Sequence, residues 1–569
     1  MRRVASALAA VALALPIPAL AQSATGEEIV VEGSLAKLSD WRVAETDHVL
    51  VYSDGREQEL VRIAHNLERL HMLLSILLNR YGQPDSALKL RVTLIGDTAE
   101  FDAMDLRNLR SRQGPFAQAF PIQRYYDPRE DGAVMAGSRI DQRIVLQSGQ
   151  SLASLSMPGL NSQTGQLDAG LFGAPNPDML TATVNAVTVP LSAEGRIYAG
   201  FAQHYLMTYF PQPWPRWYLD GFGEIFATIR VREDGKIEYG RPPEGIRKVT
   251  DWFLNYPVRD VLNGKYLVET RRPRWTPYHA WVLAHYLFFS EERKGQLHDY
   301  LAAYVRGEPL DQAAKVFGDP AKLARDVARY DNSRVPWEQM TYPAQLASEP
   351  VVRQLNRGEA AFVKGRLELG SRVETASSRD PDAAIAARNR WLARLRSDSA
   401  RYPRHPDAQL LLAEAECRSG NAAECLAAAE RVLAVDPKRV AALQWKGVAL
   451  TRQALDGPAE TRAVRLKAAR SWIARANRLD PEAPGPLLAW YRSFVDAGET
   501  PPDRALEGLL KAIDLVPAAP TQRLMLGEAF ARQNNPDAAR RLLRPIAEAG
   551  YDSPEKTRAA AILAGLPAR

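Results

Sequence analysis

The chain has 569 residues, enough for two to four domains, and its hydrophobic fraction of 46% and charged fraction of 25% are ordinary globular values. This composition excludes a disordered or fibrous protein. The formal net charge is +6 and the basic residues form no block, so we expect no nucleic-acid binding.

Residues 1–21 have the pattern of a cleavable signal peptide. Arg2 and Arg3 form a positive start, Val4 to Leu15 is a short apolar core, and Ala19-Leu20-Ala21 is a small-x-small cleavage site. An uncleaved anchor is the alternative, but the apolar run is too short for a bilayer core of roughly 30 Å. The sequence therefore predicts a periplasmic or secreted protein with no membrane span, which starts with a flexible leader over 22–40.

Residues 41–340 alternate between strand and helix patterns and predict an α+β domain. The alternation is typical of strands at 48–52 and 88–95, and apolar residues three and four apart predict an amphipathic helix over 56–81. Loops around a strand at 143–146 are expected in the segment 106–190, which is rich in Gly, Pro, Ser and Asn. Later elements are expected as helices at 196–209, 217–229 and 278–305, a strand at 236–239, two short helices within 308–331, and a linker over 336–350.

One helix of this region carries a recognisable pattern. The run Trp217-Tyr218-Leu219-Asp220-Gly221-Phe222-Gly223-Glu224-Ile225-Phe226 resembles the Trp-x-x-Glu-Gly-x-Ala-Glu-Tyr-Phe helix of gluzincin metallopeptidases. In that family a preceding helix carries His-Glu-x-x-His, and the aromatic pattern of residues 197–206 fits it. The resemblance covers about residues 45–340 and implies a zincin-like fold.

The residues that zinc chemistry needs are absent from this pattern. In the family two His and a Glu bind Zn²⁺, and a second Glu activates the metal-bound water. In the favoured register Ala199 replaces the first His, Gly200 the catalytic Glu and Gln203 the second His, while Asp220 stands at the third ligand. We therefore expect a degenerate domain with no catalytic residue, no metal and no cofactor.

Two alternatives remain open for this region. A register shifted by one residue makes His204 the second His, but the first His and the Glu are still missing. An active metal-dependent hydrolase would need an unusual ligand set. Its candidate members are His204, Asp220, Glu224, His279 and His285.

The same region predicts an aromatic cleft that suits an extended peptide. Its expected lining consists of Trp214, Trp217, Tyr218, Trp275 and Tyr278, with His204 and Glu224 beside them.

The C-terminal third repeats itself. Pro437, Pro481 and Pro517 each follow a helix pattern, at spacings of 44 and 36 residues (481−437 and 517−481), and small residues and turns keep register with them. This pattern is similar to the tetratricopeptide repeat (TPR) and predicts an all-α superhelix over 404–569, preceded by an irregular helical hairpin over 351–401. Such arrays bind proteins or peptides on their concave side. The whole chain is thus predicted to be an exported pseudo-metallopeptidase on a repeat scaffold, with a pure repeat adaptor as the third hypothesis.

The two cysteines, Cys417 and Cys425, lie on either side of a predicted turn between two repeat helices. The exported location favours a disulfide between them. Two buried thiols that pack as small apolar groups are the alternative.

Overall fold

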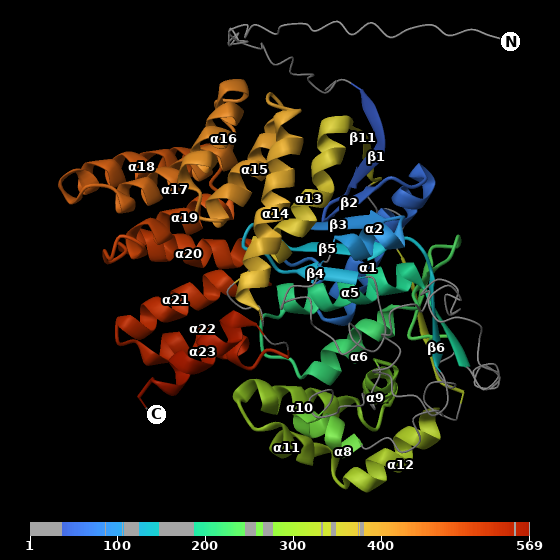
Figure 1. Cartoon of the computed structure of the whole chain (residues 1–569). Coiled ribbons are helices and arrows are strands. Elements are labelled where there is room, and N and C mark those ends of the chain that lie inside the picture. The colour runs from blue at the N-terminus through green and yellow to red at the C-terminus, as the bar shows by residue number, and fades with distance from the viewer. Residues whose placement is uncertain are drawn as a thin grey trace, which may run out of the picture.

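The protein consists of a sheet-containing N-terminal region, a helical lobe below it and a curved stack of helices beside it (Figure 1). The predicted signal peptide and the leader up to residue 36 lie outside the described residues, as does most of the segment 107–186. The computed structural model describes residues 37–85, 87–104, 106, 124–146, 187–244, 258–265, 277–331, 334–342, 349–373, 375, 380–550 and 553–567.

A mixed six-stranded sheet forms the centre of the N-terminal region. Its strand order is β11-β1-β2-β3-β5-β4, with β2, β3 and β5 parallel and the outer pairs antiparallel. The strands are β1 (Leu38–Glu45), β2 (Val49–Ser53), β3 (Leu90–Ile95), β4 (Arg124–Asp127), β5 (Val134–Ser138) and β11 (Val351–Asn356).

Helices α1 (Glu57–Leu77) and α5 (Ala193–Tyr209) cover one face of this sheet. Leu67 and Leu74 of α1 are fully buried in one apolar cluster with Val92 of β3. Full burial of such a side chain stabilises the fold by about 1.5–3 kcal/mol. The face is therefore closed by apolar packing.

Strand β11 corrects the predicted division of the chain. The segment 351–401 begins with a strand rather than a helix, and this strand pairs with β1 so that Val43 faces Arg353. The physical reason is that β1 would otherwise be an edge with unpaired backbone groups, and the β-branched pair Val351-Val352 suits a strand there. The sheet region thus extends past residue 340. Helices α13 (Arg357–Val373) and α14 (Pro381–Ala400) follow.

The helical lobe corrects two further predictions. The helix expected over 278–305 is two helices, because the chain turns at Ser290 and buries Arg293 against Asp326, at 3.0 Å. The expected linker contains strand β10 (Glu338–Thr341), which pairs with β9 (Lys236–Tyr239). The lobe comprises α8 (Val258–Asp260), a π-helical turn (Val261–Lys265), α9 (Pro277–Phe289), α10 (Lys294–Arg306), α11 (Leu310–Ala313), a 3-10 turn (Ala314–Phe317) and α12 (Pro320–Asp331). Strands β6 (Gln142–Leu146), β7 (Val187–Leu191) and β8 (Arg230–Val231) complete the described elements between β5 and β9.

The C-terminal region is a stack of antiparallel helix pairs. Gly447 lies so close to the neighbouring helix that a Cβ atom would come within 2.4 Å of Ile473 and 3.1 Å of the Ala469 carbonyl. Turns between paired helices use positive φ at Gly420, at Gly498 and, less usually, at Asn534. The pairs are α15 (Pro406–Arg418) with α16 (Ala422–Val435), α17 (Val440–Asp456) with α18 (Ala459–Leu479), α19 (Pro484–Val495) with α20 (Asp503–Leu515), and α21 (Pro520–Arg532) with α22 (Pro536–Ala547), followed by α23 (Pro554–Ala564).

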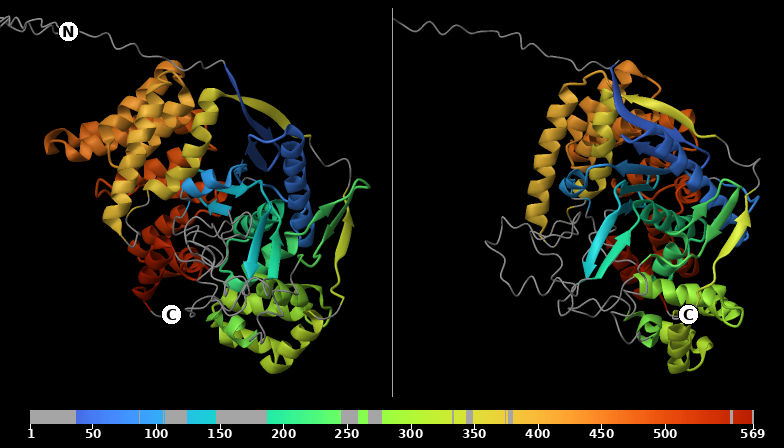
Figure 2. Two further views of the ribbon diagram at one scale, coloured as in Figure 1. Left: turned by 45° about the vertical axis from the view of Figure 1, so that its right-hand side comes forward. Right: turned by 90° about the vertical axis from the view of Figure 1, so that its right-hand side faces the viewer.

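The stack curves around the sheet region (Figure 2). Hydrogen bonds join its helices to the sheet region and to the helical lobe. The backbone NH of Leu88 donates to Leu515 at 2.9 Å, and the Tyr304 hydroxyl of the helical lobe donates to the Glu548 carbonyl at 3.0 Å. The inner side of the repeats therefore faces the sheet.

Candidate functional site

The residues that stand where the peptidase family has its zinc ligands lie on α5 and on the adjacent helix α6 (Arg216–Phe226). The Gln203 amide nitrogen is 3.2 Å from the Leu219 carbonyl and 3.4 Å from the Asp220 carboxylate. Gly200 faces Met135 and Arg124, and a Cβ atom on it would be 2.7 Å from the Met135 sulfur. Gln203 and Asp220 therefore lie at the contact between α5 and α6, and Gly200 lies against the sheet.

One ion pair joins α5 to α6 and a second lies along α6. Arg196 donates to both carboxylate oxygens of Glu224, at 2.5 and 2.7 Å, and both side chains are buried. Arg216 donates to Asp220 at 2.7 Å. Burial raises the pKa of Asp220, although the charge of Arg216 opposes the shift. Zinc needs three or four donors around one point; Ala199 and Gly200 have none and each nearby carboxylate already has a cation, so the residues present do not fit a zinc ion.

The prediction of an aromatic cleft is corrected, because those of its residues whose side chains are described belong to the core. Trp214, Trp217 and Tyr218 are each less than a tenth exposed and belong to the main apolar cluster. The Trp217 indole NH donates to the Tyr300 hydroxyl at 3.1 Å. Large aromatic rings gain more from such burial than from lining open water. Trp275 lies outside the described residues, and the side chain of Tyr278 is not described.

The remaining histidines of the proposed ligand set are also structural. His204 bonds to the Tyr126 hydroxyl at 2.8 Å, and burial lowers its pKa to about 4. His285 uses both ring nitrogens, at 2.8 Å to Tyr330 and 2.7 Å to the Gly240 carbonyl. His279 is buried on α9. Within the described residues these histidines do not meet Asp220 or Glu224 in a metal-type cluster.

A groove of about 1120 Å³ lies instead between the other face of the sheet and the first helices of the repeats. The sheet contributes residues of β2, β3, β5 and β11, and the helical wall comes from α13, α15, α17 and α19. Acidic and basic side chains occur in nearly equal numbers, among apolar ones. The polar and aromatic lining includes Arg91, Glu130, Asp131, Arg366, Glu414, Cys417, Arg418, Lys438, Arg439, Trp445, Arg452 and Arg492.

The turn between β4 and β5 enters this groove with two carboxylates. Glu130 receives a bidentate contact from Arg492, at 3.1 and 2.8 Å, and a second cation from Arg418 at 3.0 Å. Asp131 pairs with Arg366. Burial alone would raise the pKa of Glu130, but Arg492 and Arg418 outweigh it and lower the pKa to about 2. The first helices of the repeats therefore bind carboxylates within the chain itself.

Cys417 and Cys425 form a disulfide that joins α15 to α16. Cys417 lines the groove, and Cys425 is fully buried. The bridge therefore ties the groove wall to the second helix of the same pair.

Sequence reasoning missed the groove because it depends on contacts between residues that are far apart in the chain. Glu130 and Arg492 are 362 positions apart, and no local pattern marks either one. The acidic pair Glu130-Asp131 before Gly132 was the available signal, since it marks a charged turn.

Comparison with known proteins assigns the chain to no family. No family model and no curated protein matches the chain. A solved structure of a thermophilic TPR protein from Thermus thermophilus is 21% identical and covers 32% of this chain and 93% of its own, with a TM-score of 0.29. This score is too low to carry an argument, so the TPR-like assignment of the C-terminal region depends on the helix pairs described above. None of the described helices is long and apolar enough to cross a membrane.

Proposed function

We propose that this protein is an exported TPR-like scaffold that binds a segment of another protein or peptide in the groove between its sheet and its repeats. The observation that carries the proposal is the groove of about 1120 Å³, which has room for an extended chain and a wall made of first repeat helices. Export rests on the predicted signal peptide. The interpretation of residues 41–340 as a degenerate peptidase belongs to this proposal, and it gives that region a supporting, non-hydrolytic role.

The chemistry of the groove favours a polypeptide with carboxylates. Guanidinium groups of Arg418 and Arg492 already bind the internal carboxylate of Glu130, and guanidinium–carboxylate pairs are directional. Further along the wall, Arg439 and Arg452 are about half exposed or more. Asp407 and Glu414 also line the groove, which opposes a nucleic acid and suits a chain that carries both signs of charge.

The test is peptide selection on the full-length mature protein from a displayed random library, followed by fluorescence anisotropy of the selected peptides. Arg452→Glu reverses one charge in the groove and should weaken binding at least tenfold. Arg478→Glu is the matched control, because Arg478 is an exposed arginine on α18, the second helix of the same pair, and does not line the groove. The control should bind within twofold of the parent. Equal binding by both variants, or no selected peptide, would contradict the proposal.

A further inference from the structure

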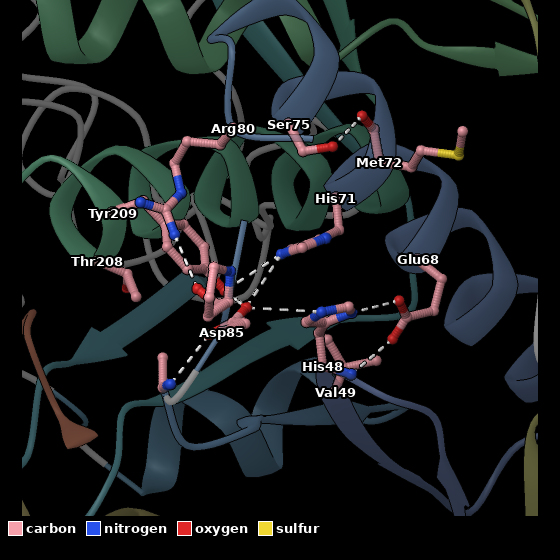
Figure 3. A network of polar contacts seen from close by, with 12 residues as sticks. His48, Val49, Glu68, His71, Met72, Ser75, Arg80, Asp85, Thr208 and Tyr209 are labelled. Atoms are coloured by element: carbon pink, nitrogen blue, oxygen red, sulfur yellow. Dashed lines mark hydrogen bonds and ion pairs between the residues drawn. The ribbon is translucent and has the colours of Figure 1, made fainter. Parts of the chain in front are cut away.

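A second pocket of about 200 Å³ lies on the opposite side of the sheet from the groove, where α1, the end of α5 and the segment before β3 meet (Figure 3). Its described lining includes three carboxylates, Asp47, Glu68 and Asp85, one arginine, Arg80, and two histidines, His48 and His71. The excess of negative charge favours a cation. No residue of this pocket lines the groove.

Three side chains converge in this pocket with the donor atoms that a transition metal prefers. His48 Nε2 is 3.6 Å and His71 Nε2 is 3.7 Å from the same carboxylate oxygen of Asp85. Ligand atoms about 2.0–2.1 Å from a tetrahedral zinc ion are themselves about 3.3–3.5 Å apart. Among the described residues, this is the one group of three such side chains whose donor atoms all lie within 4.8 Å of one another.

The surroundings orient His48 in the way that metal-binding histidines are oriented. The Glu68 carboxylate contacts His48 Nδ1 at 2.7 Å and also accepts the His48 backbone NH at 2.8 Å. These contacts leave Nε2 directed toward Asp85 (Figure 3). A carboxylate behind a ligating histidine is a recurrent feature of zinc sites, where it fixes the ring and its tautomer.

Tyr209 of the pocket wall contacts both His71 and Asp85. The Tyr209 hydroxyl lies 3.1 Å from His71 Nε2 and donates to Asp85. Arg80 stacks its guanidinium on the ring of Tyr209, 4.6 Å from the ring centre. An ion at this point would take over the contacts that Tyr209 now makes with His71 and Asp85.

We propose that His48, His71 and Asp85 form a Zn²⁺ site, with water from the pocket as the fourth ligand and Glu68 as a positioning residue. Two imidazoles and one carboxylate are a common protein ligand set for zinc, and an adjoining pocket leaves an open coordination position. The site is separate from the α5–α6 positions of the peptidase pattern and does not depend on the groove.

The test is zinc titration of the full-length mature protein after treatment with a chelator, with a competing chromophoric chelator as the readout. We expect one Zn²⁺ per chain. His71→Gln and Asp85→Asn should each weaken binding at least 100-fold, and Glu68→Gln about 10–100-fold. His65→Gln is the matched control, since His65 lies on the same helix α1 and pairs with Glu349 instead; it should bind within twofold of the parent.

Cobalt provides a second readout, because a tetrahedral Co²⁺ complex has strong visible absorption that should appear in the parent and disappear in Asp85→Asn. Circular dichroism of each metal-free variant checks folding. Asp85→Asn should disturb folding little, because the Asp85 side chain is partly exposed. Substoichiometric zinc in the parent, or unchanged affinity in both folded ligand variants, would overturn the proposal.

Discussion

The helix pair α5–α6 and the repeat pair α17–α18 both place arginines near carboxylates, yet the two regions use them differently. Between α5 and α6, Arg196 and Glu224 are both less than a tenth exposed and pair with each other. On α17, Arg452 pairs with Asp456 while both remain more than half exposed beside the groove. The Arg196–Glu224 pair is thus enclosed in the core, whereas Arg452 remains accessible from the groove.

The difference comes from the residues around each pair. Helix α6 is apolar or aromatic on most of its surface, with Phe222, Ile225 and Phe226 almost fully buried. Helix α17 packs small buried residues against its neighbours, with Ala442 in a cluster with Val432 of α16 and Gly447 against Ile473 of α18. A further side of α17, which includes Arg452, lines the groove.

The largest effect is expected when the enclosed pair is broken. Glu224→Gln removes the buried carboxylate charge that Arg196 contacts at 2.5 and 2.7 Å, and should lower the free energy of unfolding by about 3–5 kcal/mol. Urea unfolding followed by circular dichroism measures it. The double variant Arg196→Met/Glu224→Leu should recover most of the loss, and a loss below about 1 kcal/mol in Glu224→Gln would show that this region is not enclosed.

The disulfide between α15 and α16 should stabilise the repeat region. The double variant Cys417→Ala/Cys425→Ala removes a cross-link that closes a loop with a sequence separation of eight, and should lower stability by about 2–3 kcal/mol in the chain-entropy model. Thermal unfolding with and without reductant measures it. The denatured, unreduced parent should contain no titratable thiol; two thiols per chain would contradict the bridge.

The acidic turn between β4 and β5 joins the sheet to α15 and α19 and makes the stability depend on pH. The folded-state pKa of Glu130 is lowered, so its stabilising effect is complete above the ordinary pKa near 4.5 and is lost as pH falls toward 2. Glu130→Gln should cost about 2 kcal/mol at pH 7 and remove that part of the acid sensitivity. Unfolding at pH 7 and at pH 3 measures both, and hydrogen exchange should rise in α15 and α19. An unchanged pH profile in the variant would contradict this role.

The smallest effect is expected at the exposed pair of the groove. Arg452→Glu should change the free energy of unfolding by less than about 0.5 kcal/mol, because exposed ion pairs contribute little. Its effect should appear in peptide binding instead. A loss of stability like that of Glu224→Gln would mean that the two regions do not differ in the way described.

The sequence predicted the regular elements better than the sites. Apolar spacing placed α1, and the repeated prolines and small residues placed the helix pairs, so a mixed sheet region followed by TPR-like helices is confirmed at that level. The zincin-like interpretation stays a prediction. The aromatic residues around Trp217 were interpreted as a cleft because a pattern of large rings gives the same signal whether the rings line a cavity or fill a core.

The polar pockets depend on chain geometry that no local pattern contains. His48 precedes a strand, His71 lies on the following helix, and Asp85 lies in the connection to β3. They meet because α1 crosses back over β2 and its connection returns beside β3. Spacings of 23 and 14 residues (71−48 and 85−71) match no short metal-binding motif.

Strand β11 has a consequence for how the chain acquires its structure. Strand β11 pairs with β1 but follows it in the chain by more than 300 residues. The hydrogen bond that the Ser39 hydroxyl donates to the Leu355 carbonyl therefore needs both ends of this long segment. A nascent chain that ends at residue 340 has an open strand edge, and long-range strand pairing is slow to form. The sheet therefore cannot be completed until residues up to Asn356 are present, and a fragment cut before Val351 should aggregate more readily than one that ends after Asn356.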